Sequence, residues 1–289
     1  MDFLSPTSLP EALRLRAERP EAIPLAGGTD VMVEVNMDHR RPDALLDLTA
    51  VPELRECSAD GGRLRIGAGV PYTRLIEEFG DRLPGLAMAA RTVGSPQIRN
   101  RGTLGGNLGS GSPAGDGHPP LLAAGAEVEL VSVRGSRLVP AAEFFTGPKR
   151  TALAGDELIA AVHLDPAGGP QQFAKVGTRN AMVIAVCTFA LALHPAQRRV
   201  GTGVGSAGPT PFRAREAEEF LAAELDWDSP GALPESLTRR FGELVAAAAR
   251  PIDDVRGTAD YRRHALGVLA HRALRRVWDE HRTGRPECA

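Results

Sequence analysis

The chain has 289 residues, of which 43% are hydrophobic, and a formal net charge of -2 at pH 7; these values are ordinary for a globular protein long enough to form two domains. The near-neutral balance gives no reason to expect nucleic acid or an anionic membrane as a partner. The N-terminus lacks a basic segment followed by an apolar core, and the longest apolar run, 183–193, is too short for a membrane span, so we expect a cytoplasmic protein.

The cysteines and histidines show no metal-binding pattern. Cys57, Cys187 and Cys288 are far apart and have no CxxC spacing. An iron–sulfur cluster normally takes four thiolates, so the chain is not expected to hold one alone. Cys187 lies in an apolar segment and is interpreted as a core residue, the other two as free thiols. Without an HExxH motif or a His/Cys cluster, we expect no metal site.

The first half of the sequence predicts alternating helices and strands. Ser8 is expected to cap a helix that reaches Arg19 and ends before Pro20. A short strand at 23–25 follows, and this alternation is typical of a small α/β layer. The other elements expected before residue 165 are an apolar segment at 30–35, strands at 44–48, 126–133 and 157–164, a strand within 61–70, and helices at 73–79, 86–92 and 119–124.

After a predicted linker at 165–170, the sequence indicates a second region of strands followed by helices. The expected strands are 173–176, 183–193 and 200–204, and the expected helices are 214–225, 236–249 and 258–280. The last helix has an apolar face and a basic stripe, which we interpret as a solvated face, with a docking surface as the alternative. The stripe consists of Arg262, Arg263, Arg272, Arg275 and Arg276.

Two glycine-rich segments carry the strongest functional signal. GSPQIRNRGTLGGNLGSGSPAGD occupies 94–116, and LAGGTD occupies 25–30, directly after a predicted strand. Glycine permits left-handed turns and close approach of the main chain to a ligand. Successive N–H groups in such segments can bind anions. Together the two segments favour a site for an extended dinucleotide over a pair of ordinary tight turns.

Other nucleotide and catalytic motifs are missing or lie in the wrong context. There is no GxxxxGK[ST] phosphate loop and no GxSxG elbow. A GxGxxG pattern at 203–208 is followed by Pro209 and Pro211 where a helix should begin, so we interpret it as a coincidental match. No acid, base or nucleophile stands out near the glycine-rich segments. We therefore predict no catalytic side chain and expect a redox cofactor to carry the chemistry.

The pairing of LAGGTD with TLGGNLGSGSPAGD resembles the FAD-binding medium subunit, or domain, of the molybdenum hydroxylases, the xanthine dehydrogenase and carbon monoxide dehydrogenase family. QIRNRGTLGGN, FAKVGTRNAMVIAV and VGSAGPTPFRAREAE extend the resemblance over nearly the whole chain. It implies an α+β fold: a two-lobed FAD-binding domain of the PCMH type at 1–166, with lobes at about 1–52 and 53–166. A C-terminal domain at 171–289, an antiparallel sheet packed with helices, would follow, with FAD in the cleft between the two.

The resemblance also implies which residues contact FAD. It makes 25–31 one pyrophosphate loop and 103–107 the second, and it places Asp116, Val93, Leu158 and Lys175 at the cofactor. The full set is Leu25, Ala26, Gly27, Gly28, Thr29, Asp30, Val31, Val93, Thr103, Leu104, Gly105, Gly106, Asn107, Asp116, Leu158 and Lys175. Many relatives carry an aspartate directly before the Ile-Ala at 184–185, where this chain has Val183; Arg179 keeps a positive charge nearby.

The function implied by the resemblance is an electron relay. Substrate would be hydroxylated at a molybdopterin cofactor on a large partner subunit. Electrons would pass through [2Fe-2S] clusters on a small partner subunit to FAD in this chain, and leave to NAD+, oxygen or a quinone. Two alternatives stay open: a self-contained flavin-dependent oxidoreductase of the same broad fold, and a non-catalytic scaffold protein whose glycine-rich segments are only turns.

Overall fold

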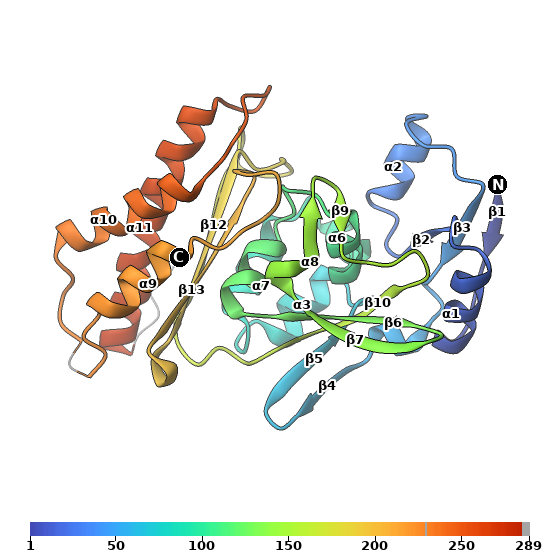
Figure 1. Cartoon of the computed structure of the whole chain (residues 1–289), viewed down its shortest axis with the longest axis horizontal. Coiled ribbons are helices and arrows are strands. Elements are labelled where there is room, and N and C mark those ends of the chain that lie inside the picture. The colour runs from blue at the N-terminus through green and yellow to red at the C-terminus, as the bar shows by residue number, and fades with distance from the viewer. Residues whose placement is uncertain (229, 285–289) are drawn as a thin grey trace.

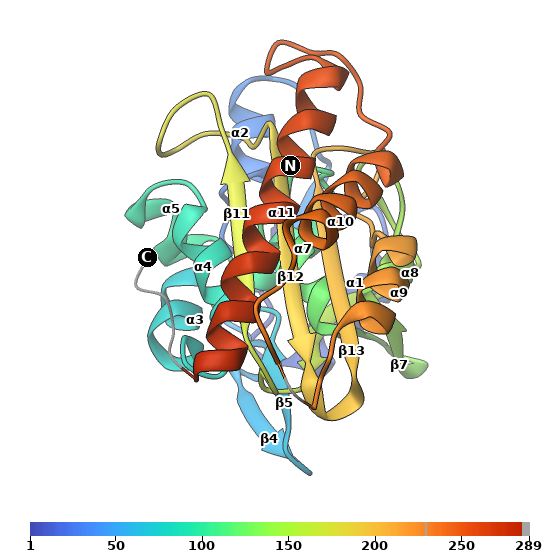
Figure 2. The same cartoon turned by 90° about the vertical axis from the view of Figure 1, so that its left-hand side faces the viewer.

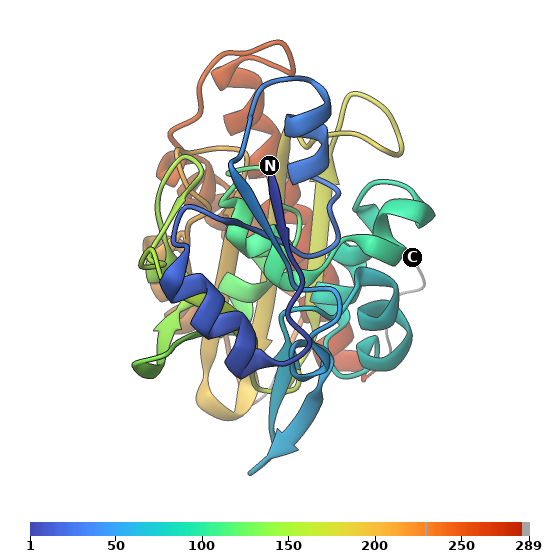
Figure 3. The same ribbon diagram turned by 90° about the vertical axis from the view of Figure 1, so that its right-hand side faces the viewer.

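A small parallel sheet forms the N-terminal end of the computed structural model, which describes residues 1–228 and 230–284 (Figure 1). Its strand order is β1-β3-β2, with β1 at Asp2–Leu4, β2 at Ile23–Leu25 and β3 at Ala44–Asp47. Helix α1 (Leu9–Glu18) begins at the predicted cap, because the Ser8 side chain accepts a hydrogen bond from the Glu11 N–H. Helix α2 (Val31–Asn36) and a 3-10 turn at Pro52–Arg55 complete this part. In Figure 3 these blue elements lie nearest the viewer, opposite the C-terminal helices.

A five-stranded antiparallel sheet, in the order β4-β5-β10-β6-β7, forms the middle of the molecule. Its strands are β4 (Cys57–Asp60), β5 (Arg63–Gly67), β6 (Glu127–Ser132), β7 (Gly135–Pro140) and β10 (Leu158–Leu164). The helices around it are α3 (Tyr72–Phe79), α4 (Pro84–Thr92), α5 (Pro96–Arg101), α6 (Leu104–Ser110), α7 (His118–Ala124) and α8 (Ala141–Phe144), and a small hairpin joins β8 (Phe145–Gly147) to β9 (Arg150–Thr151).

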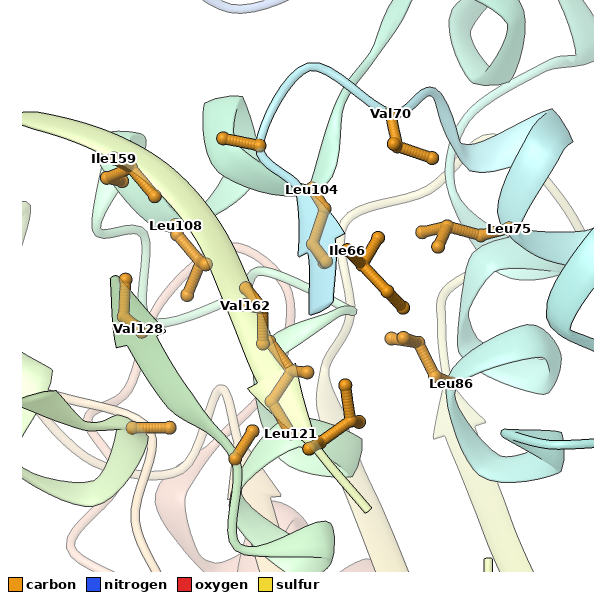
Figure 4. Close-up of a cluster of buried hydrophobic side chains, with 14 of the residues drawn as sticks. Ile66, Val70, Leu75, Leu86, Leu104, Leu108, Leu121, Val128, Ile159 and Val162 are labelled. Carbon is orange, nitrogen blue, oxygen red and sulfur yellow. The ribbon is translucent and has the colours of Figure 1, made fainter. Parts of the chain in front are cut away.

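The central strand β10 divides its side chains between two hydrophobic cores. Val162 pairs with Ile66 of β5 and Val128 of β6, and these side chains pack against α3, α4, α6 and α7 (Figure 4). A register shift between Ile159 and Ala161 changes the alternation. Leu158 therefore packs into a separate cluster with residues of α1 and β3. This strand thus joins the parallel sheet to the five-stranded sheet.

A three-stranded antiparallel sheet and three helices form the C-terminal part. The strands are β11 (Gln171–Val176), β12 (Cys187–His194) and β13 (Arg199–Gly205), with a 3-10 turn at Pro195–Gln197. The helices are α9 (Arg215–Glu224), α10 (Glu235–Ala248) and α11 (Ala259–Thr283). Figure 2 shows α10 and α11 in front of one sheet face, while α4 and α7 contact the other. This mixed helix-and-sheet architecture confirms the predicted α+β class.

The predicted strand at 183–193 begins four residues later than expected, at Cys187. Ile184 is 53% exposed, and Met182 has a φ of 49° in the left-handed region. The Arg179 guanidinium donates to the carbonyl oxygens of Ala181 and Met182, so this segment closes on itself as a loop. The predicted strand was too long because residues 183–186 are apolar, although they lie before the strand in the structure.

The GxGxxG text at 203–208 has a packing role. A Cβ atom on Gly201 or Gly203 of β13 would collide with the carbonyl oxygen of Ala123 or Pro119 in α7. Main chain therefore contacts main chain where helix α7 crosses the strand. Ala190 and Ala192 of β12 pack with Ala123 on the same sheet face. We call this face, made of Ala190, Ala192, Gly201 and Gly203, the small-residue face.

The predicted basic stripe of the last helix is wrong at Arg262. Its side chain is 5% exposed and donates to the Ser206 carbonyl oxygen at 2.7 Å and to Asp254 Oδ1 at 2.5 Å. Arg272, Arg275 and Arg276 are exposed, as expected of a solvated face. Arg262 instead ties α11 to the turn after β13.

Within the described residues, no helix is both long and apolar enough to cross a membrane, and no three His, Cys, Asp or Glu side chains are grouped as metal ligands. The thiols of Cys57 and Cys187 are free. Cys187 is fully buried, which confirms its interpretation as a core residue. Cys288 lies outside the described residues.

Candidate functional site: a cleft between the two glycine-rich segments

A cleft of about 1980 Å³ runs between the parallel sheet, the middle sheet and the C-terminal part. Thirteen of the sixteen predicted contact residues line it. These are Ala26, Gly27, Gly28, Thr29, Asp30, Val31, Val93, Thr103, Gly105, Gly106, Asn107, Asp116 and Leu158. Leu25 lies outside the wall at the end of β2, Leu104 is fully buried in the core, and Lys175 reaches the site through Asp116.

The two glycine-rich segments touch each other. A Cβ atom on Gly27 would collide with the carbonyl oxygen of Arg101, two residues before the TLGGN text of the second segment. An ideal Cβ on Gly106 would lie 4.0 Å from Cβ of Ala26. Segments about seventy-five residues apart in the sequence therefore face each other across one site, as the sequence predicted.

The first segment offers a run of free backbone donors. The N–H groups of residues 27–31 donate to no described residue, and Gly28 has a φ of 77°. Successive N–H groups around a left-handed residue form a concave nest that binds anions. Because this nest faces the cleft, it can bind a phosphate group.

The sequence suggested that residues 103–107 form a free loop. In the structure they begin helix α6 instead. Thr103 caps the helix, because its Oγ1 accepts a hydrogen bond from the Gly106 N–H at 3.0 Å. The N–H groups of Leu104 and Gly105 donate to Val70 and Ala68, and that of Asn107 donates to Thr103. These four amides are thus occupied, so residues 104–107 offer no second nest for an anion.

Four buried oxygen atoms of residues that line the cleft have no hydrogen-bond partner among the described residues. Three lie next to the second segment, Oδ1 of Asn107, Oδ1 of Asp116 and the hydroxyl of Tyr72, and the fourth is Oγ of Ser206. Buried polar atoms are nearly always paired, so a group of unpaired ones at a cleft indicates a ligand with hydroxyl or amide groups. No sequence pattern singled out Tyr72, because the predicted helix began at Thr73. The available signal was an aromatic residue directly after Pro71, where a helix can start.

Asp116 and Lys175 form a buried ion pair between the middle and C-terminal parts. Lys175 Nζ lies 2.5 Å from Asp116 Oδ2 and 3.3 Å from the Thr92 carbonyl oxygen, and both charged side chains are less than 10% exposed. Burial raises the pKa of Asp116, while the Lys175 ammonium acts in the opposite direction. The pair holds Lys175 on β11 against the end of the second glycine-rich segment.

His118 supports the second segment from beneath. Its ring is fully buried, packs 4.5 Å from the Phe145 ring centroid, and brings Nε2 to 3.0 Å from the Asn107 carbonyl oxygen. Burial lowers the pKa of His118 to about 4, so the ring is neutral at pH 7. Since a carbonyl can only accept, Nε2 carries the proton in this contact.

Charged side chains close the cleft at one edge. Lys149, in the turn between β8 and β9, lies 2.9 Å from Glu34 of α2, so its ammonium bridges the two walls. The hydrogen bond from Lys149 lowers the pKa of Glu34. Burial, followed by the nearby Glu34 carboxylate, raises the pKa of Asp30 beside the nest.

The C-terminal part contributes residues that the sequence did not predict. Ser206, Asp254 and Arg262 line the cleft, and Ser206 has a φ of 58°. The Ser206 N–H donates to the Pro113 carbonyl oxygen at 2.8 Å, which joins this turn to the second glycine-rich segment. The GPTP text at 208–211 marked the turn, but no sequence pattern indicated that Arg262 would reach it.

Two family models together match most of the chain. The model described as the FAD binding domain in molybdopterin dehydrogenase matches residues 1–166. The CO dehydrogenase flavoprotein C-terminal domain matches residues 172–277. The chain belongs to the FAD-binding subunits of the molybdenum hydroxylases.

Individual relatives and solved structures support this assignment. The chain is 33% identical over 282 residues to the putative xanthine dehydrogenase FAD-binding subunit of Escherichia coli (strain K12), covering 92% of each. It is 30% identical over 292 residues to the carbon monoxide dehydrogenase medium chain of Hydrogenophaga pseudoflava, covering 96% of each. A solved structure of carbon monoxide dehydrogenase from Hydrogenophaga pseudoflava, lacking the Mo-pyranopterin moiety, superposes with a TM-score of 0.88 at 29% identity over 97% of this chain and 98% of that one.

The cleft of this molybdenum hydroxylase subunit has the donors and acceptors that FAD requires. The nest at residues 27–31 supplies N–H donors for a diphosphate. The unpaired oxygens of Asn107 and Asp116 can accept hydrogen bonds from sugar or ribityl hydroxyls. Gly106 lies between the two segments, because an ideal Cβ there would be 3.0 Å from Thr103 Oγ1 and 4.0 Å from Cβ of Ala26. The residues present therefore fit the cofactor that the family binds.

Proposed function

We propose that the chain is the electron-transfer subunit of a molybdenum hydroxylase complex. FAD bound in the cleft would take electrons from [2Fe-2S] clusters of a small partner subunit and pass them to an external acceptor such as NAD+, oxygen or a quinone. The molybdopterin cofactor would belong to a large partner subunit. The observation that carries the proposal is the union of the free amide nest and the unpaired oxygens of Asn107 and Asp116 in one cleft.

In this proposal the side chains of the cleft bind and orient, and none transfers a group. The amides of residues 27–31 hold the diphosphate, and the Asp116–Lys175 pair places a fixed cation close to the cofactor. Leu158 supplies an apolar wall between two cores. We include all sixteen predicted residues in the cofactor site, with Leu25, Leu104 and Lys175 acting from behind the cleft wall.

The proposal assigns choice of substrate to the partner subunits. The two relatives above are named for different reactions, of xanthine and of carbon monoxide, yet each aligns with more than nine-tenths of this chain. A subunit that served only as the relay would be shared between such reactions. We also propose the division into a FAD-binding domain at 1–166, with lobes at about 1–52 and 53–166, and a C-terminal domain at 171–289. The cytoplasmic location stays a prediction.

The test is to purify the chain after co-expression with its genomic neighbours and measure flavin, iron and molybdenum in the same complex. We expect a flavin spectrum with iron and molybdenum, and flavin reduction when a substrate of the complex is added. Flavin without partners, with turnover by the chain alone, would replace the relay with a self-contained oxidoreductase. A folded but colourless protein in the presence of added FAD would replace it with the scaffold alternative.

A further inference from the structure

The buried hydroxyl of Tyr72 lies at the cleft and has no hydrogen-bond partner among the described residues. We propose that Tyr72 is a further cofactor-binding residue, whose hydroxyl donates a hydrogen bond to a polyol oxygen of FAD, from the ribityl chain or the ribose. This inference rests on FAD binding in the cleft, and adds a residue outside both glycine-rich segments.

The main chain fixes the Tyr72 ring beside the second segment. Tyr72 is the first residue of α3, and its N–H donates to the Gly102 carbonyl oxygen at 3.0 Å. The preceding residue, Pro71, forms an isolated β-bridge with Thr103. The ring is only 2% exposed, packed in the core shown in part in Figure 4, and cannot turn its hydroxyl out to solvent.

The hydroxyl lies with the two unpaired acceptors. An ideal Cβ on Gly117 would lie 3.1 Å from the Tyr72 hydroxyl and 3.0 Å from Asn107 Oδ1, so these two oxygens flank the same point. Asp116, the neighbour of Gly117, carries the third unpaired oxygen. The cluster thus holds one donor and two acceptors, which matches a polyol, because each of its hydroxyls both donates and accepts.

The phenol stays protonated at neutral pH. Burial raises the pKa of Tyr72 well above its ordinary value, and the carboxylates of Asp116 and Asp30 act in the same direction. A tyrosine kept only for packing would gain by losing this oxygen, because a buried unpaired hydroxyl destabilises the folded chain. A ligand that accepts from it accounts for its presence.

The decisive variant is Tyr72→Phe, which keeps the ring and removes only the oxygen. We expect the dissociation constant for FAD, measured by flavin fluorescence on the refolded or freshly stripped chain, to rise about 3- to 20-fold. The midpoint of thermal unfolding of the cofactor-free variant should stay equal or rise. A structural hydroxyl would show the reverse, a lower midpoint with unchanged affinity, and would overturn the proposal.

Two control variants separate this effect from general ones. Thr188→Val removes another buried unpaired hydroxyl, one that lies outside the cleft, and should leave FAD affinity unchanged. Tyr261→Phe changes the only other tyrosine of the sequence, which is half exposed on α11. If Thr188→Val weakens FAD binding as much as Tyr72→Phe does, the proposal is wrong. If the unaltered chain binds no FAD, the cofactor assignment itself fails, which is a distinct result.

The same variant distinguishes the two polyol sources. ADP carries the ribose and diphosphate without the ribityl chain, and riboflavin carries the ribityl chain alone. If Tyr72 contacts the ribityl chain, Tyr72→Phe should weaken riboflavin binding and leave ADP competition unchanged. If it contacts the ribose, the pattern is reversed. If Tyr72→Phe and the unaltered chain bind each of FAD, ADP and riboflavin with the same affinity, Tyr72 makes no contact with the cofactor and the proposal is wrong.

Discussion

Lys175 Nζ lies 2.5 Å from Asp116 Oδ2 and joins β11 of the C-terminal domain to the second glycine-rich segment of the FAD-binding domain. Neither residue has another charged partner among its described contacts. Burial of each charge has a cost that the other charge and the hydrogen bonds with Thr92 offset. The position of the C-terminal domain is therefore linked electrostatically to the geometry of the cofactor site.

Removal of one partner should be more harmful than removal of both. We expect Lys175→Met to lower the free energy of unfolding by about 3–5 kcal/mol, because it leaves the Asp116 carboxylate buried and unpaired. The double variant Lys175→Met with Asp116→Leu should recover much of that loss. Denaturant unfolding of the single and double variants measures the coupling. A loss below about 1 kcal/mol for Lys175→Met would show that the pair is solvated in solution.

Gly105 and Gly106, adjacent in sequence, should respond oppositely to substitution. An ideal Cβ on Gly105 lies 2.5 Å from Cβ of Ala68, so Gly105→Ala should destabilise the chain by about 1–3 kcal/mol through overpacking. An ideal Cβ on Gly106 instead meets no main-chain atom and lies 3.0 Å from the side-chain oxygen of Thr103 and 4.0 Å from Cβ of Ala26. Gly106→Val should therefore fold and lose FAD binding. Flavin content and thermal unfolding, measured on both variants, test this contrast; stoichiometric flavin in Gly106→Val would contradict the cofactor position.

The small-residue face should not tolerate even a methyl group. Gly203→Ala places a Cβ against the Pro119 carbonyl oxygen, so we expect a loss of about 1–3 kcal/mol or more in denaturant unfolding. The matched control is Gly155→Ala, where nothing lies within 4 Å of an added Cβ. Equal stability of the two variants would mean that α7 does not rest on β13 in solution.

Acid should destabilise the chain through His118. The pKa of His118 is lowered by burial from 6.5 to about 4, so the unfolded chain binds a proton that the folded chain excludes. Stability from this group is full above pH 6.5 and falls as the pH drops to 4, by about 3 kcal/mol in total. In denaturant unfolding at pH 7, 5.5 and 4.5, His118→Gln should show a shallower loss than the unaltered chain. His264→Gln, at an exposed position, serves as the control and should keep the original slope.

The sequence predicted the adjacency of the two segments but not their different structures. LAGGTD after a short strand and the glycines at 94–116 indicated a shared ligand site, and their faces do meet at Gly27 and Arg101. Helix α6 was missed because four residues of LGGNLGS are glycine or asparagine, which disfavour a helix. Thr103 could have signalled the cap, but the burial of Leu104 and Leu108 in the core stabilises this helix, and such contacts are invisible in a local pattern.

Contacts between polar groups that are distant in the sequence were the other feature that the sequence did not predict. The spacing of residues on the last helix predicts that Arg262 faces solvent. In the structure it is buried and donates hydrogen bonds to Ser206 and Asp254, which lie in other parts of the sequence. The hydroxyl of Tyr72 stands out only because its surroundings contain no partner for it. Apolar periodicity predicts which face is covered, whereas the pairing of polar atoms depends on segments that meet only after folding.

The small-residue face also constrains how the cofactor is exchanged. Helix α7 rests on β13 through backbone atoms at Gly201 and Gly203, without long side chains that could slide or change rotamer. Opening this contact would separate the main-chain atoms of α7 from those of β13, and it would also expose the Asp116–Lys175 pair. We therefore expect FAD to enter the cleft with α7 still packed on β13. Flavin uptake should thus require no separation of the C-terminal part from the rest of the molecule.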